Sequence, residues 1–151
     1  MAGSTGPSAL WYLTRGTGPV TLILLTASLG LGVSNVRRIR TERVPRFVFD
    51  AVHRSVSMLA VAFLAVHIIT SVLDPFAPIQ LTDAIVPFVS AYRPLWLGLG
   101  AIACDLLIAV MVTSLARRRL GYDAWRLTHW LAYACWPVAL IHGLRIAAGA
   151  K

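Results

Sequence analysis

The sequence predicts an all-α integral membrane protein, a four-helix bundle with both termini on the outer side of the membrane. Hydrophobic residues make up 58% of the 151-residue chain and charged residues only 13%, whereas a soluble domain is about half apolar and a quarter charged. The charges gather in short basic clusters between long uncharged stretches. A helix needs ~20 apolar residues to cross the bilayer core, and four stretches reach that length.

The first stretch covers about residues 11–36, and no charge follows Arg15 within it. No basic residue precedes its apolar part, so we expect a retained helix rather than a cleaved signal peptide. The other stretches cover about 52–73, 94–116 and 125–146, the third with Asp105 inside it. We expect residues 1–151 to form a single transmembrane domain.

The loops predict how the chain is oriented. Arginines crowd the loop after the first stretch and the loop after the third: Arg37, Arg38, Arg40, Arg43 and Arg46, then Arg117, Arg118 and Arg119. The positive-inside rule places these loops in the cytoplasm, which leaves both termini outside. The loop over 74–93 holds two aspartates, one arginine and three prolines. Proline opposes a continuous helix there, and a short interfacial helix over 81–89 is compatible with the sequence.

Several function classes are excluded by composition and motifs. The net charge of +8 does not indicate nucleic-acid binding, because the arginines sit in short loops between membrane spans. We find no GxGxxG and no Walker motif, and therefore no soluble flavin or nicotinamide domain. Cys104 and Cys135 fall inside spans, where small buried hydrophobes are expected. The preference for arginine over lysine and the many alanines favour a bacterial source.

All four histidines lie in the second and fourth stretches, as two pairs: His53 and His67, then His129 and His142. An ionisable residue inside a membrane span indicates a functional site. The two stretches run in the same direction, so His53 shares the inner level with His129, and His67 shares the outer level with His142. With a rise of ~1.5 Å per residue, the levels lie ~20 Å apart.

Facing imidazoles without a neighbouring carboxylate or thiolate suit the axial ligation of haem iron. With both axial positions filled, no site remains for oxygen, which favours electron transfer. His53 and His67 are fourteen residues apart and share a helix face. The thirteen-residue step from His129 to His142 does not, and we expect a kink at Pro137 to correct it.

Arginines near the histidines are candidates to pair with haem propionates. Arg54 and Arg126 have the depth of the inner level, and Arg15, Arg93 and Arg145 have that of the outer level. Interfacial snorkelling is the alternative explanation for each of them.

Other polar and small residues within the spans carry weaker signals. Glycines in the first and third stretches allow either close helix packing or room for a porphyrin: Gly30, Gly32, Gly98 and Gly100. Asp105 is a candidate partner for the hydroxyl of Thr26 or Ser28, with proton transfer as an alternative role.

The segments HRSVSMLAVAFLAVH (53–67), WRLTHWLAYACWPVALIHG (125–143) and TRGTGPVTLILLTASLGLGV (14–33) resemble the ferric reductase-like transmembrane domain. That family includes ferric reductases, NADPH oxidases and the haem subunit of a periplasmic methionine sulfoxide reductase system. The resemblance implies two b-type haems, ligated by His53 with His129 and by His67 with His142. Large members have six spans and an FAD/NAD(P)H domain, and both features are missing from this sequence.

The resemblance therefore implies a multi-pass protein of the bacterial plasma (inner) membrane, the electron-transfer component of an oxidoreductase, embedded in lipid. A separate flavoprotein or quinol would be its donor, and an extracytoplasmic redox protein or ferric iron its acceptor. Two alternatives stay open. The chain could be a structural anchor or assembly subunit of a redox complex, or a histidine-based proton or metal transporter.

Overall fold

The computed structural model describes residues 8–36, 45–75 and 77–149. Four helical spans are long and apolar enough to cross a membrane, as the sequence predicts. They comprise α1 (Ala9–Val36), α2 (Arg46–Leu73), α3 (Pro94–Leu115) and a fourth span that is divided into α5 (Tyr122–His129) and α6 (Leu131–Ala148). The short helix α4 (Arg117–Leu120) and the 3₁₀ helix η1 (Leu81–Ala84) belong to the connections.

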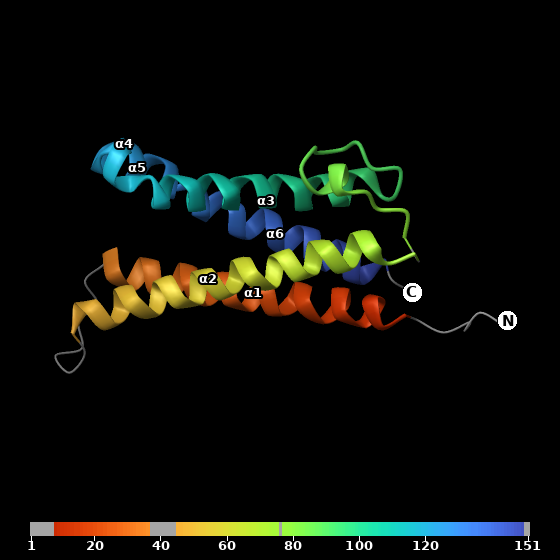
Figure 1. Cartoon of the computed structure of the whole chain (residues 1–151), viewed down its shortest axis with the longest axis horizontal. Coiled ribbons are helices and arrows are strands. Elements are labelled where there is room, and N and C mark those ends of the chain that lie inside the picture. The colour runs from red at the N-terminus through yellow and green to blue at the C-terminus, as the bar shows by residue number, and fades with distance from the viewer. Residues whose placement is uncertain (1–7, 37–44, 76, 150–151) are drawn as a thin grey trace, which may run out of the picture.

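The spans pack as two antiparallel pairs (Figure 1). Helix α1 lies along α2, and α3 lies along α6, while the pairs meet where α1 contacts α6. Within the described ranges, no Cα atom of α2 comes within 8 Å of α3 or α6. The indole Nε1 of Trp136 donates to Thr26 Oγ1 at 2.8 Å and so links α6 to α1.

The start of α1 and the end of α6 lie at the same end of the bundle as the 74–93 loop (right in Figure 1). Helices α4 and α5 mark the opposite end, which we call the α4 end; the other is the η1 end. The predicted arginines of the first loop at 37, 38, 40 and 43 lie outside the described residues. The first helix thus begins, and the last helix ends, on one side of the bundle, and the assignment of that side to the exterior stays a prediction.

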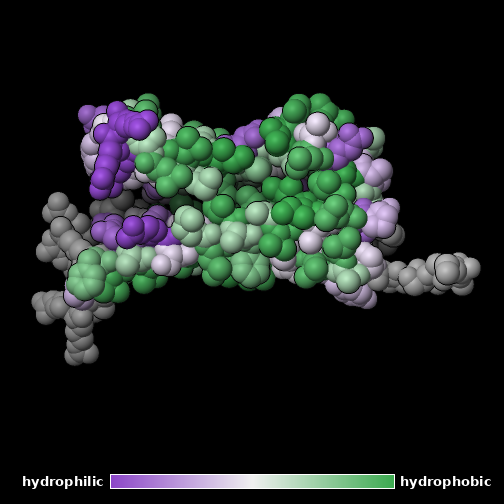
Figure 2. Space-filling view, in the orientation of Figure 1, coloured by the Kyte–Doolittle hydropathy of each residue, from purple (hydrophilic) through white to green (hydrophobic). Residues whose placement is uncertain are grey.

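The surface suits a lipid environment. Figure 2 shows an apolar band along the bundle, with hydrophilic residues gathered toward the two ends. Large side chains such as Ile23, Met58 and Leu144 are exposed on the helices, where they would contact acyl chains. The buried apolar side chains of the described residues are all small: Ala60, Ala101, Ala103, Cys104, Val110 and Cys135. The bundle therefore has no interior filled by large side chains, and on the face shown a furrow separates the two pairs toward the α4 end (Figure 2).

The fourth span has an interruption that the sequence did not predict, and the kink expected at Pro137 stays a prediction. The helix is interrupted at Trp130, and α6 continues through Pro137. The N–H of Tyr133 donates to the Trp130 carbonyl at 3.0 Å, a tight turn of the 3₁₀ kind. Such a turn rotates the chain by about 120° per residue instead of about 100°. The added rotation reduces the angular offset between His129 and His142, which is the correction that the sequence required.

The 77–93 loop folds back against α3. Phe88, with a left-handed φ of 67°, lies over Gly98, and a Cβ at Gly98 would come within 2.8 Å of the Phe88 backbone nitrogen and 2.3 Å of its ring. Gly98 therefore makes room for the loop, a role other than the helix packing or the porphyrin space that the sequence suggested. At Gly30, by contrast, an added Cβ would meet nothing within 4 Å.

We expect Gly98→Ala to destabilise the protein, because an added methyl group must displace loop backbone. The expected loss is about 1–3 kcal/mol, typical of overpacking, measured by thermal or denaturant unfolding in detergent. Gly30→Ala is the matched control and should be neutral or stabilising by up to about 1 kcal/mol, since alanine favours helix. Equal stability of the two variants would contradict the close packing of Phe88 on Gly98.

Candidate functional site

The histidines of α2 are held by α1 through backbone carbonyl groups. Nδ1 of His53 lies 3.0 Å from the Ser28 carbonyl oxygen, and Nδ1 of His67 lies 3.0 Å from that of Thr14. A carbonyl can only accept, so each Nδ1 carries the proton and each neutral ring keeps its lone pair on Nε2. That is the tautomer in which a histidine binds a metal through Nε2.

The same arrangement holds His142 on α6. Its Nδ1 lies 2.8 Å from the Trp96 carbonyl oxygen of α3. In all three cases a glycine follows the carbonyl four residues later, one helical turn on, and faces the imidazole: Gly32 for His53, Gly18 for His67 and Gly100 for His142. Gly100 therefore makes room for a histidine ring, whereas a Cβ at Gly32 would make only an ordinary contact with one.

His129, at the end of α5, has a different support. Its Nδ1 lies 3.4 Å from the hydroxyl oxygen of Ser114 on α3. The indole of Trp125 lies beside the imidazole, with ring centroids 5.0 Å apart and planes tilted by 33°. The guanidinium of Arg117 lies 4.3 Å above the same indole. His129 thus depends on side chains where the other three depend on the backbone.

His53 and His129, which were predicted to share a level, lie near each other in the structure. The ring centroids of His53 and His129 are 6.3 Å apart, with planes at 64°. Two imidazoles on opposite sides of one metal, with metal–nitrogen bonds of about 2.1 Å, have centroids roughly 6–7 Å apart. At the η1 end, His67 is held against α1 and His142 against α3. At the α4 end the structure therefore pairs one histidine of α2 with one of the fourth span, and the same pairing at the η1 end stays a prediction.

The donor set fits a haem better than a bare metal ion. Among the described residues no group of three or more histidine, cysteine or acidic side chains could hold a metal ion. A structural or catalytic zinc site takes at least three protein ligands, whereas haem iron takes four ligands from the porphyrin and two from the protein. Two imidazoles per level, separated helix pairs and a small-residue core match that requirement.

The candidate arginines lie at both ends of the bundle. Arg54 and Arg126 are exposed toward the α4 end. Arg15 and Arg145 are exposed toward the η1 end, where Arg15 lies 4.6 Å from the Trp11 ring and Arg145 5.0 Å from the Trp96 ring. Arg93 is directed elsewhere, since its Nη2 bonds the Gly149 carbonyl oxygen.

The two hydroxyls suggested as partners of Asp105 bond to other groups. Thr26 donates to the Leu22 carbonyl and accepts from Trp136. The hydroxyl of Ser28 lies 2.7 Å from that of Ser57. Both hydroxyls are therefore occupied within α1, α2 and α6, and neither bonds to Asp105.

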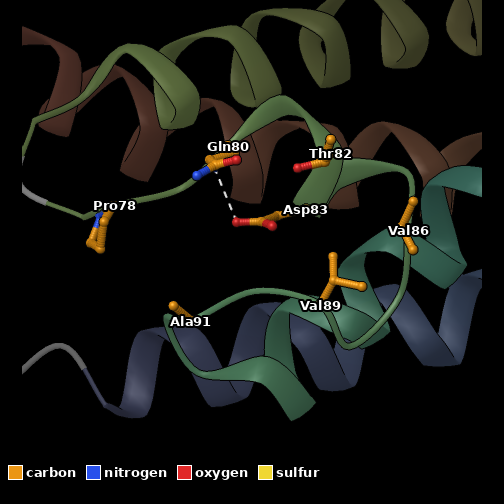
Figure 3. A pocket seen from close by; sticks show the side chains of 7 residues that line it. All are labelled: Pro78, Gln80, Thr82, Asp83, Val86, Val89 and Ala91. Atoms are coloured by element: carbon orange, nitrogen blue, oxygen red, sulfur yellow. Dashed lines mark hydrogen bonds between the residues drawn. The ribbon is translucent and has the colours of Figure 1, made fainter.

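A pocket of ≈ 400 Å³ in the loop at the η1 end is lined by residues of the 78–91 segment (Figure 3). Its carboxylate, Asp83, is buried and accepts from the Gln80 backbone N–H at 3.0 Å. That bond belongs to a capping box at the start of η1. None of the four histidines lines this pocket, so it is separate from the two histidine levels.

The residues that sequence reasoning missed are the supports of the histidines: Thr14, Ser28, Trp96, Ser114 and Trp125. A signal was present for two of them. Thr14 and Ser28 are fourteen residues apart, as His53 and His67 are, and each is followed four residues later by glycine. Two antiparallel helices with equal spacings can place both contacts in register.

Comparison with curated proteins and with solved structures finds no significant match. A family model, the ferric reductase like transmembrane component, matches residues 17–143. The match covers the second and third spans, most of the first and fourth, and all four histidines. The chain is therefore a multi-pass membrane protein that belongs to the ferric reductase-like transmembrane family.

Proposed function

We propose that this protein is a di-haem carrier that moves electrons across the membrane, with one haem b between His53 and His129 and a second between His67 and His142. Membrane electron transfer is the general activity of the family. The observation that carries the finer proposal is the Nδ1–carbonyl bond of three histidines, which leaves Nε2 free as a ligand. Bound haem would supply a one-electron couple at each level.

The protein would fix the chemistry through its ligands. Two imidazoles per level fill both axial positions, so no position is left open for oxygen or another substrate. The backbone carbonyls and the glycines hold each ring in one orientation, which lowers the reorganisation that a change of charge would otherwise cause. Both features favour electron transfer over catalysis at the iron.

Charge distribution supports a direction for the transfer. Arg117, Arg118 and Arg119 form α4, and the positive-inside rule assigns that end to the cytoplasm. Outward movement of an electron is then favoured by about 2.3 kcal/mol per 100 mV of inside-negative potential. We infer that electrons enter at the His53–His129 level and leave at the His67–His142 level.

The arginines would bind the propionates of the two haems. Arg54 and Arg126 have the position for the level at the α4 end, and Arg15 and Arg145 for the level at the η1 end. Arg145 lies on Trp96, whose carbonyl holds His142, so its guanidinium is near the ligand that it would serve. A bidentate pair with a carboxylate needs only a change of rotamer at these exposed side chains.

The donor and the acceptor would be other molecules. We infer that a flavoprotein or a quinol reduces the protein, and that an extracytoplasmic redox protein or ferric iron oxidises it. The protein would then be one component of an oxidoreductase rather than a complete enzyme.

Reduced-minus-oxidised spectra of the purified protein in detergent test the proposal. We expect a b-type spectrum, two haems per chain by pyridine haemochrome assay, and two reduction steps in a potentiometric titration. A protein without haem, purified from haem-replete cells, would favour the anchor or the histidine-based transporter instead. A five-coordinate high-spin spectrum would contradict bis-histidine ligation.

A further inference from the structure

His129 differs from the other three histidines in what holds its ring. His53, His67 and His142 each bond a backbone carbonyl, whereas the partner of His129 Nδ1 is the Ser114 hydroxyl at 3.4 Å. A carbonyl fixes the tautomer because it can only accept. A hydroxyl can donate or accept, so it leaves either ring nitrogen free to carry the proton.

The Ser114 hydroxyl is itself oriented by Trp125. The indole Nε1 donates to Ser114 Oγ at 3.3 Å, and an indole N–H cannot accept. This bond occupies one lone pair of the oxygen and leaves the second lone pair and the hydroxyl hydrogen for Nδ1 of His129. Trp125 also packs beside the imidazole, so one tryptophan restrains both partners of the hydrogen bond.

The contact between Ser114 and His129 lies at the ends of two helices, where a side chain takes the place of the backbone carbonyl that holds the other histidines. Ser114 is the penultimate residue of α3, and His129 is the last residue of α5. The residue four positions after Ser114 is Arg118, where the other supports have glycine.

We propose that Ser114, oriented by Trp125, is the positioning residue of His129 and holds its ring through Nδ1, on the side away from Nε2. The proposal rests on the proposed function in treating His129 as a haem ligand. Of the four groups that bond a histidine Nδ1, the Ser114 hydroxyl is the one that a side-chain substitution can delete. The haem site at the α4 end therefore depends on Ser114, and the site at the η1 end does not.

Haem titration of the full chain in detergent, after expression without haem, separates the two sites. His67→Ala leaves only the site at the α4 end, and His53→Ala leaves only the site at the η1 end. Adding Ser114→Ala to each variant should raise the Kd for haem about 10–100-fold in the first, as for other partners of metal-binding histidines. It should leave the second unchanged.

Two variants serve as controls in the His67→Ala background. Ser114→Thr keeps the hydroxyl and should retain most of the affinity. Thr113→Ala removes a neighbouring hydroxyl that bonds only to the carbonyls of Ala109 and Val110 in its own helix, and it should have no effect. An equal loss from Thr113→Ala, or a loss in both histidine backgrounds, would show a general disturbance of α3 and overturn the proposal.

Nitrogen-15 NMR of the histidines in the haem-free protein tests the same contact without the cofactor. We expect Ser114→Ala to move the ring-nitrogen signals of His129 and to leave those of His53, His67 and His142 in the Nδ1–H tautomer. Unchanged His129 signals would refute the role of Ser114. Failure of the wild type to bind haem would refute the proposed function, while this measurement would still decide the inference.

Discussion

Replacing His67 by alanine is expected to lower the haem content from two per chain to one. Under the proposed function His67 and His142 share one haem, so loss of either imidazole would leave that iron with one protein ligand, and a b-type haem has no covalent tether to keep it. Pyridine haemochrome assay against protein concentration gives the ratio. Both single variants, His67→Ala and His142→Ala, should lose the same haem, with the same reduction step missing.

Double variants test the pairing itself. His67→Ala combined with His142→Ala should lose no more than either single change, because both act on one site and their effects are not additive. His67→Ala combined with His53→Ala should lose both haems. If the first double variant lost both haems, or the second kept one, the assignment of histidines to levels would be wrong.

Much of the architecture follows from the sequence because a bilayer imposes few solutions. Backbone groups in lipid must bond within the helix, so long apolar stretches predict α1, α2 and α3 to within a few residues at most ends. The exception is the start of α2, which begins at Arg46, ahead of the predicted 52. A positive charge there is tolerated, because this first turn lies beyond the apolar part of the helix.

The interruption at Trp130 was not predictable from the sequence. Proline is the residue that breaks helices by its own chemistry, and the sequence accordingly indicated Pro137. The structure places the tight turn seven residues earlier, where no glycine or proline stands. The position of this turn is a property of how the fourth span packs on α3, which local sequence does not specify.

The nearness of His53 to His129 was predictable, whereas the sequence held a signal for only two of the supports, Thr14 and Ser28. Depth in the membrane depends only on residue number and helix rise, which places His53 beside His129. A bond from Nδ1 to a carbonyl depends on the rotation and register of two helices, and every residue has a carbonyl. The glycines that permit the close approach were visible in the sequence, yet nothing local distinguished Gly100, which faces a histidine, from Gly98, which faces Phe88.

Gly100→Ala is expected to remove most haem from the site at the η1 end. A Cβ at this position would lie 2.7 Å from Cε1, 2.8 Å from Nδ1 and 3.1 Å from Nε2 of His142. The whole ring would have to move away from α3. That movement lengthens the 2.8 Å bond to the Trp96 carbonyl, which is worth about 1 kcal/mol, and it turns Nε2 away from its direction toward the iron.

Gly18 and Gly32, the other two glycines that face a histidine ring, should show graded effects on haem affinity when each is replaced by alanine. At Gly18 the added Cβ would lie 3.1 Å from Cε1 of His67, and at Gly32 it would lie 3.6 Å from Cε1 of His53. The second distance is an ordinary contact, so Gly32→Ala should bind haem as the wild type does. Gly18→Ala should weaken binding slightly, and Gly100→Ala by about 10–100-fold, the range for disturbed partners of metal-binding histidines.

Unfolding measurements separate haem loss caused by a displaced His142 from haem loss caused by a less stable protein. Alanine favours a helix over glycine by up to about 1 kcal/mol, so haem-free Gly100→Ala should unfold no earlier than the haem-free wild type. Equal loss of haem from all three glycine variants would indicate that helix packing, and not the imidazole, is what each glycine serves. A loss confined to Gly100→Ala, with the site at the α4 end intact, would instead tie haem retention to the space that one missing methyl group leaves for His142.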